Sequence, residues 1–88
     1  MIEFNIYKNT YIDSVTLMST SARLKKEFDV EELVMLMATE MNKEMIRNVG
    51  FNDRSLSDAG PSDLVVGIDH TGDEELMETL FEALTNND

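Results

Sequence analysis

Cysteine and tryptophan are absent from this sequence of 88 residues, which also contains only one proline and one histidine. Without cysteine the chain cannot form a disulfide, a thiolate metal site or a cysteine nucleophile. At this length it forms one domain, residues 1–88, near the lower size limit for a single hydrophobic core. Its stability must therefore come from apolar packing, with oligomerisation as a further source.

Positive charge is scarce as well: 7 lysines and arginines stand against 18 aspartates and glutamates, which gives a net charge of −11. Nucleic acid is a poor partner for such a chain, since phosphate binding requires clustered basic residues. No apolar run approaches the length of a transmembrane helix, and the N-terminus "MIEFNIYKNT" has no signal-peptide pattern. We expect a soluble protein of the cytoplasm that binds neither nucleic acid nor membranes.

Three short segments have the pattern of β-strands. Residues 2–7 alternate between apolar and polar side chains, as a half-buried strand does. The continuous apolar run of residues 33–38 predicts an interior strand, and "DLVVGIDH", residues 63–70, predicts a third.

Helices are predicted over residues 14–28, over residues 40–49 and from Asp73 onward. Asp13, Thr39 and Asp73 stand in N-cap positions, and Gly50 is a natural stop. The first helix has two apolar rows, which predict a broad buried face: Val15, Met18 and Ala22, and Leu17, Leu24 and Phe28. The apolar stripes of the other two helices are Met41, Met45, Ile46 and Val49, and Leu76, Met77, Leu80, Phe81 and Leu84.

The stretch "VMLMATEMNKEM" places four methionines within residues 34–45. Met35 and Met37 share one face of the second strand, while Met41 and Met45 lie one turn apart on the next helix. This arrangement favours packing of both elements on one core. Thioether ligation of a soft metal is the alternative, although no histidine or cysteine accompanies the methionines.

The order strand, helix, strand, short helix, strand, helix predicts an α+β fold: a small ferredoxin-like sandwich of about three strands. We expect the first and third strands side by side and the second beside the third. The helices should lie on one face of the sheet, with the two longer ones packed behind it. The fourth strand of that fold is missing, which would leave an edge bare, at residues 2–7.

Candidate metal ligands occur in "DHTGDEE", where His70 supplies an imidazole and Asp69, Asp73 or Glu74 supplies oxygen. The alternative is structural: His70 and Thr71 form a turn, and the acidic residues favour the start of the following helix. We favour this alternative and expect no metal, because one histidine with flexible carboxylates has no fixed ligand spacing.

Catalytic groups are hard to find. The hydroxyls of Ser19, Thr20 and Ser21 lie on a predicted helix, distant in sequence from the histidine, so we expect no nucleophile, no catalytic residue and no cofactor. The acidic residues are most simply a solvated face: Glu31, Glu32, Glu74, Glu75, Glu78 and Glu82.

Residues 51–62, "FNDRSLSDAGPS", have the composition of a flexible loop, and residues 85–88 that of a frayed tail. Gly67 within a strand indicates a close approach, by a packed helix or by a ligand or partner. The candidate interaction residues are therefore Phe51, Leu56, Pro61 and Gly67.

Three stretches resemble the N-terminal domain of the FdrA family: "DSVTLMSTSARL" (13–24), "VMLMATEMNKEMIRNVGF" (34–51) and "PSDLVVGI" (61–68). Members of that family are acyl-CoA synthetase-like (ADP-forming) proteins related to the succinyl-CoA synthetase alpha chain, and one branch is tied to carbamoyl transfer. The resemblance implies CoA-binding and ligase-like domains downstream of such a segment. It carries over no catalytic residue, and His70 is not the family's phosphoryl-carrying histidine.

These observations together predict a non-catalytic accessory domain that acts by docking on downstream domains or subunits, or on a second copy as a homodimer. The alternative is a regulatory module that senses a small molecule such as an acyl-CoA. A stand-alone enzyme is the least favoured reading.

Overall fold

The computed structural model describes residues 2–28, 30–70 and 76–85. In chain order the elements are β1 (Ile2–Tyr7), α1 (Ser14–Glu27), β2 (Val30–Met37), α2 (Glu40–Val49), α3 (Ser55–Asp58), β3 (Leu64–His70) and α4 (Leu76–Thr85). The predicted α+β order is confirmed, with the short helix α3 in addition. The predicted N-cap at Asp73 and residues 86–88 of the predicted tail lie outside the described residues.

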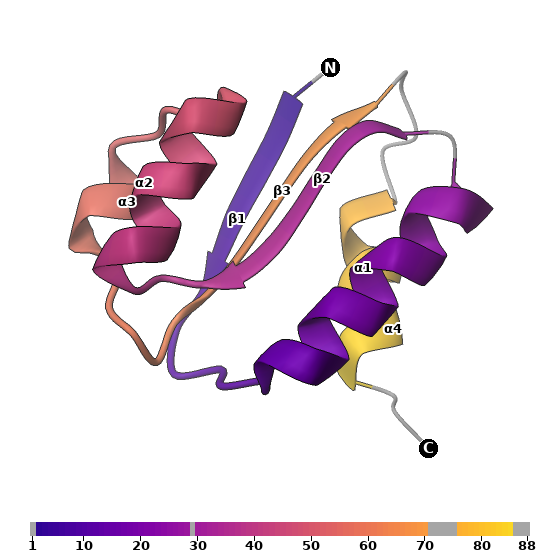
Figure 1. Cartoon of the computed structure of the whole chain (residues 1–88), viewed down its shortest axis with the longest axis horizontal. Helices are drawn as coiled ribbons and strands as arrows, with labels where there is room; N and C mark the ends of the chain where they lie inside the picture. The colour runs from indigo at the N-terminus through magenta and orange to yellow at the C-terminus, as the bar shows by residue number, and fades with distance from the viewer. Residues whose placement is uncertain (1, 29, 71–75, 86–88) are drawn as a thin grey trace.

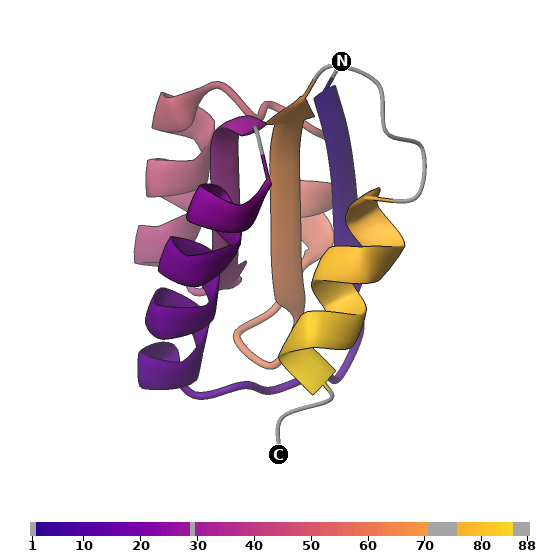
Figure 2. The same ribbon diagram turned by 90° about the vertical axis from the view of Figure 1, so that its right-hand side faces the viewer.

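The sheet has three antiparallel strands in the order β1-β3-β2. Because β3 runs antiparallel to both neighbours, β1 and β2 are parallel to each other and are linked through α1, which is the split βαβ arrangement of ferredoxin-like folds. Figure 2 shows the strands side by side, with α1 in front of β2 and α4 in front of β1. The predicted strand order is confirmed, and within the described residues β1 and β2 are the two edges.

Helices cover both faces of the sheet (Figure 1). As expected, α1 and α4 share one face, over a core that includes Leu24, Met35 and Leu80. The prediction that all helices lie on that face is wrong, because α2 and α3 cover the other face around Ile46 and Leu56. The reason lies in β3, which is buried at nearly every position and therefore needs apolar cover on both sides.

The helix boundaries follow the predicted capping residues. Asp13 accepts a hydrogen bond from the N–H of Thr16, and Thr39 accepts one from the N–H of Asn42, so both act as N-caps. Gly50 ends α2 with a φ of 120°, in the left-handed region that favours glycine.

Two predicted apolar faces are wrong. On α1, Val15 and Met18 are 74% and 69% exposed, so only the row with Leu17 and Leu24 is buried. On α2, Met41, Met45 and Val49 are exposed, and the buried positions are Ile46 and, unexpectedly, Lys43. The Lys43 stem packs inside while its Nζ lies 3.5 Å from the Ser57 carbonyl oxygen, which places α3 against this face of α2.

The segment 51–62 is not a simple loop. It contains α3 and three buried apolar anchors, Phe51, Leu56 and Ala59, which pack with Val65 of β3. Its polar composition concealed these anchors, because they are isolated between Asn, Asp and Ser residues and show no periodicity.

Candidate functional site

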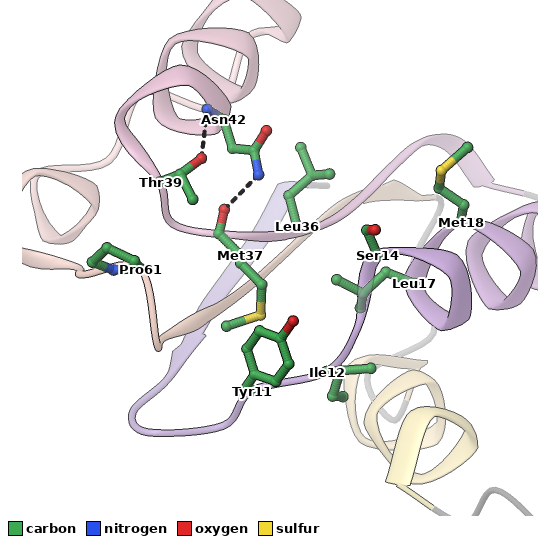
Figure 3. Close-up of a pocket in the computed structure, with 10 residues that line it drawn as sticks. All are labelled: Tyr11, Ile12, Ser14, Leu17, Met18, Leu36, Met37, Thr39, Asn42 and Pro61. Atoms are coloured by element: carbon green, nitrogen blue, oxygen red, sulfur yellow. Dashed lines mark hydrogen bonds between the residues drawn. The ribbon is translucent and has the colours of Figure 1, made fainter.

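A mostly apolar groove of about 510 Å³ opens between the N-terminal parts of α1 and α2. Ser14, Leu17 and Met18 of α1 line one wall, while Asn42 of α2 and its cap Thr39 line the other (Figure 3). We call this hollow the β2 groove, because the end of β2 forms its base.

The base of the β2 groove consists of Leu36 and Met37. Tyr11 and Ile12, from the connection between β1 and α1, and Pro61, from the connection between α3 and β3, complete its lining. Figure 3 shows the Tyr11 ring beside the Met37 side chain, with Met18 on the far wall.

Asn42 fixes the geometry of the groove with two hydrogen bonds. Its backbone N–H donates to Thr39 Oγ1 at 3.2 Å, and its side-chain Nδ2 donates to the Met37 carbonyl oxygen at 2.9 Å (Figure 3). The side chain thus ties the end of β2 to the start of α2 and satisfies a carbonyl that the sheet leaves open.

The α2 wall continues past the groove along the edge of β2. Met45 and Val49 follow Asn42 at positions i+3 and i+7, so the three side chains lie on one face of the helix. Val49 also lines a smaller hollow beside Glu31 and Glu32 at the start of β2. An exposed apolar row, 51% exposed at Met45 and 46% at Val49, therefore runs beside the edge strand.

A carboxylate lies at the α1 end of the groove. The backbone N–H of Thr16 and, after it, the Thr16 hydroxyl lower the pKa of Asp13, each by donating at 2.8 Å. Asp13 therefore stays charged beside the groove-lining Ser14 at neutral pH.

Three of the four predicted interaction residues are buried. Phe51 and Leu56 are 4% and 0% exposed, and Gly67 lies under the Phe51 ring. Their surroundings are those of packing residues, and close internal packing accounts for the glycine. Pro61 is the exposed member of the set and lines the β2 groove.

The structure does not bring the candidate metal ligands His70 and Asp69 together. Successive side chains of a strand point to opposite faces, and His70 belongs to the face that carries α1 and α4. There it is 2% exposed, with Nε2 at 2.6 Å from Glu3 Oε2. His70 is thus the last residue of β3, not part of a turn as expected, while Asp73 and Glu74 lie outside the described residues.

The hydroxyls of Ser19 and Ser21 bond to the helix that carries them. Ser19 Oγ donates to the Val15 carbonyl at 2.8 Å, and Ser21 Oγ donates to the Met18 carbonyl at 3.1 Å. Thr20 is buried in α1. All three hydroxyls therefore lie on a helix, as predicted.

A sequence model of one protein family matches residues 1–87, and its description is "AllF, heavy metal-associated domain". The chain belongs to this family. The uncharacterised protein YahF of Escherichia coli (strain K12) is 39% identical over 87 residues, which are 97% of this chain and 17% of YahF. The chain therefore spans less than a fifth of the length of this curated relative. No solved structure matches the chain.

The family description names AllF, so the resemblance to FdrA stays a prediction. The AllF-type domain has no cysteine, and its described residues contain no group of three or more His, Asp or Glu side chains that could hold a metal ion. None of the described helices is long and apolar enough to cross a membrane.

Sequence reasoning missed Met18, Met45 and Val49 as surface residues because it assigned every apolar row to the core. One signal was present in α1, which carries two apolar rows, whereas a helix at a sheet surface buries only one face. Thr20 and Lys43 are buried although their side chains are polar, so side-chain polarity alone predicted the wrong buried faces for α1 and α2.

Proposed function

We propose that this AllF-type domain is a non-catalytic accessory domain that acts by protein contact through the β2 groove. In this proposal it belongs to an acyl-CoA synthetase-like protein of the FdrA type and docks on the CoA-binding or ligase-like domains, or on a second copy. The observation that carries the proposal is an edge strand, β2, flanked by exposed apolar side chains on both adjoining helices.

The composition of the groove supports contact over catalysis. Its polar lining side chains are Ser14, Thr39, Asn42 and the Tyr11 hydroxyl, and none of them is a carboxylate, an imidazole, a thiol or an amine. The Thr39 hydroxyl already accepts a hydrogen bond as the N-cap of α2, and the Asn42 side chain already donates one to the Met37 carbonyl. The apolar lining and the exposed row beside it match the surface that a protein partner covers.

Heavy-metal binding, which the family description suggests, does not fit the residues present. Soft metals select thiolate and thioether ligands, and the chain has no thiolate. Its methionines do not form one cluster, because Met35 and Met37 are buried in the core below α1 and α4 while Met41 and Met45 are exposed on α2. The histidine is buried against Glu3 within the sheet. We therefore derive no metal-dependent step for this domain.

Association measurements test the proposal. The domain would be studied by gel filtration with light scattering, from millimolar to micromolar concentration, alone and mixed with YahF from which the matching segment has been deleted. We expect a complex, either with the truncated YahF or with a second copy. Met18→Glu should abolish it because it places a charge in the groove wall.

Val15→Glu is the matched control, since Val15 lies on the same helix, is as exposed as Met18 and does not line the groove. It should leave the complex intact. A domain that stays monomeric at millimolar concentration and does not bind truncated YahF would contradict the proposal.

Small-molecule sensing is a second candidate, and the size of the groove favours it. About 510 Å³ lies within the range of small-molecule sites. Thermal unfolding with acyl-CoA, CoA, carbamoyl phosphate and amino acids would test it. A ligand should raise the unfolding temperature of the domain but not that of the Met18→Glu variant, and no shift across the panel would dismiss the idea.

A further inference from the structure

The outer edge of β2 presents unpaired backbone groups at alternate residues. The N–H of Ala38 donates to the Asp63 carbonyl at 3.0 Å, so these two residues form a hydrogen-bonded pair across β2 and β3. Bonded and non-bonded pairs alternate in an antiparallel ladder. The register then directs the N–H and C=O groups of Val34 and Leu36 toward β3, and those of Leu33, Met35 and Met37 outward.

Both ends of this edge are closed. The Met37 carbonyl accepts hydrogen bonds from Asn42 Nδ2 and from the N–H of Thr39, each at 2.9 Å. At the other end a register shift between Val30 and Glu32 interrupts the ladder, which is a common way to block pairing at an edge. The section open to another strand therefore runs from Leu33 to the N–H of Met37 and stops short of the Met37 carbonyl.

The two walls determine which side chains an added strand could carry. Its side chains would alternate between the α1 side, where Met18 is 69% exposed, and the α2 side, where Met45 and Val49 are exposed. Both directions therefore offer exposed apolar side chains, and the α1 side becomes polar only toward the start of β2, where Lys25 lies 3.7 Å from Glu32. A strand that is covered on both faces has a continuous apolar run, not an alternating one.

The charges at the two ends of the open section indicate which residues would flank that run. Glu31 and Glu32 stand at one end, and Asp13 and Glu40 stand near the other, in a chain of net charge −11. Lys25 lies 3.7 Å from Glu32 and Lys43 lies 3.5 Å from Glu40, which offsets part of this charge and leaves each end with an excess of carboxylate. A second copy would bring its own Glu31 and Glu32 to the same edge, and like charges oppose such pairing. Lys or Arg residues on either side of the apolar run would be attracted.

We infer that the β2 groove binds an extended segment of a protein partner: an apolar run of about five residues, flanked by Lys or Arg, which adds to the sheet beside Leu33–Met37 as a new strand. This inference rests on the proposed contact function and specifies the chemistry of the partner.

The test uses the whole domain and fluorescein-labelled synthetic peptides, with binding followed by anisotropy. The main probe is Lys-Lys-Val-Ile-Val-Leu-Val-Lys-Lys, and its partner probe replaces all four lysines by glutamate. Two further probes carry N-methyl groups on alternate residues of the apolar run, in opposite phases, so that one loses the N–H groups that face β2 and the other loses those that face away.

We expect the lysine peptide to bind and the glutamate peptide to bind at least about tenfold more weakly. One N-methyl phase should abolish binding, while the other retains it. Met18→Glu should weaken binding about tenfold or more, and Val15→Glu should change it less than about twofold. In hydrogen exchange the amides of Leu33 and Met35 should become slower when the lysine peptide is bound.

Equal binding of the two N-methylated peptides would overturn the addition of a strand to β2. Equal binding of the lysine and glutamate peptides would overturn the preference for a basic partner. Either result would leave the proposed contact function in place. The same holds if no peptide binds but the domain forms a dimer that Met18→Glu disrupts, since the partner would then be a second copy. Absence of peptide binding together with absence of any complex in the light-scattering experiment would overturn both proposals.

Discussion

The ring of Phe51 lies directly on Gly67 of the central strand, so closely that a Cβ at position 67 would come 3.0 Å from Phe51 Cδ1. Phe51 is 4% exposed, and its N–H donates to the Ile46 carbonyl at 3.1 Å, so the ring is attached to the end of α2. The glycine therefore allows the layer of α2 and α3 to approach the sheet. The contact between Phe51 and Gly67 joins these helices to β3 within the core on this face of the sheet.

Gly67→Ala should destabilise the domain by about 1–2 kcal/mol, because the added methyl group overpacks a site in which the ring has little room to move. Phe51→Ala should cost about 3–5 kcal/mol through the cavity that it leaves. In the double variant the alanine at position 67 should no longer be harmful, so the two effects should not add. Urea unfolding of the four proteins measures the cycle, and additive values would show that the close contact carries no energy.

The sequence predicted the elements of the fold because local signals define them: the alternation in residues 2–7, the caps at Asp13 and Thr39, and the stop at Gly50. Strand order followed from the split arrangement of ferredoxin-like folds, which the order of the elements predicts. The sequence could not show that β3 is covered on both faces, because the apolar run of residues 64–68 is also compatible with a strand that packs against helices on one face only. The second helical layer was missed for that reason.

Leu56 provides a direct test of the corrected segment 51–62. It is fully buried although polar residues surround it in sequence, whereas Pro61 of the same segment is exposed. Leu56→Ala should lower the free energy of unfolding by about 2–5 kcal/mol, while Pro61→Ala should change it by less than about 1 kcal/mol. Urea titration of both variants decides the point: a Leu56→Ala protein as stable as the wild type would restore the original interpretation of a flexible loop.

Asp63 makes a pH-dependent contribution to stability. Its carboxylate accepts from the N–H groups of Gly60 and Asn9, each at 2.9 Å, and from Lys8 Nζ at 3.2 Å. These contacts, with the Gly60 bond first, lower the pKa of Asp63 from 3.8 to about 2. Since the folded state holds the proton less tightly than the unfolded state, the contribution is complete above about pH 4 and is lost as the pH falls toward about 2.

Asp63→Asn should therefore lower the urea midpoint at pH 6, and the difference from the wild type should shrink between about pH 4 and pH 2. Glu82→Gln, on the exposed side of α4, removes the same charge without these contacts and should not reproduce the effect. If the gap between Asp63→Asn and the wild type stayed constant over this pH range, the carboxylate would not be the source of the stabilisation.

Less of the site than of the fold could be predicted, and the reason is geometric. Which of two apolar rows on α1 faces the sheet depends on how the helix is rotated, and Val15 and Leu17 are equally apolar in the sequence. The prediction that residues 33–38 form an interior strand is wrong, because β2 lies at an edge of the sheet. The continuous apolar run reflects cover on both faces of the strand and does not show whether a neighbouring strand lies on each side. Pro61 follows Gly60 in a stretch that favours a turn, and it is exposed and lines the β2 groove, while its part in an interaction stays a prediction.

The absence of thiolates in a domain of the heavy metal-associated AllF family leads to the last prediction. We expect Zn²⁺ and Cu⁺ to leave the unfolding temperature unchanged, because an ion that bound only the folded state would raise it. His70→Gln tests the remaining imidazole. It should lower stability by about 1–3 kcal/mol, since it removes the 2.6 Å contact with Glu3 inside the sheet, yet leave metal content after dialysis at the background level of the wild type. One equivalent of tightly held metal in the wild type that is lost in His70→Gln would reverse this conclusion and assign the histidine to a metal site.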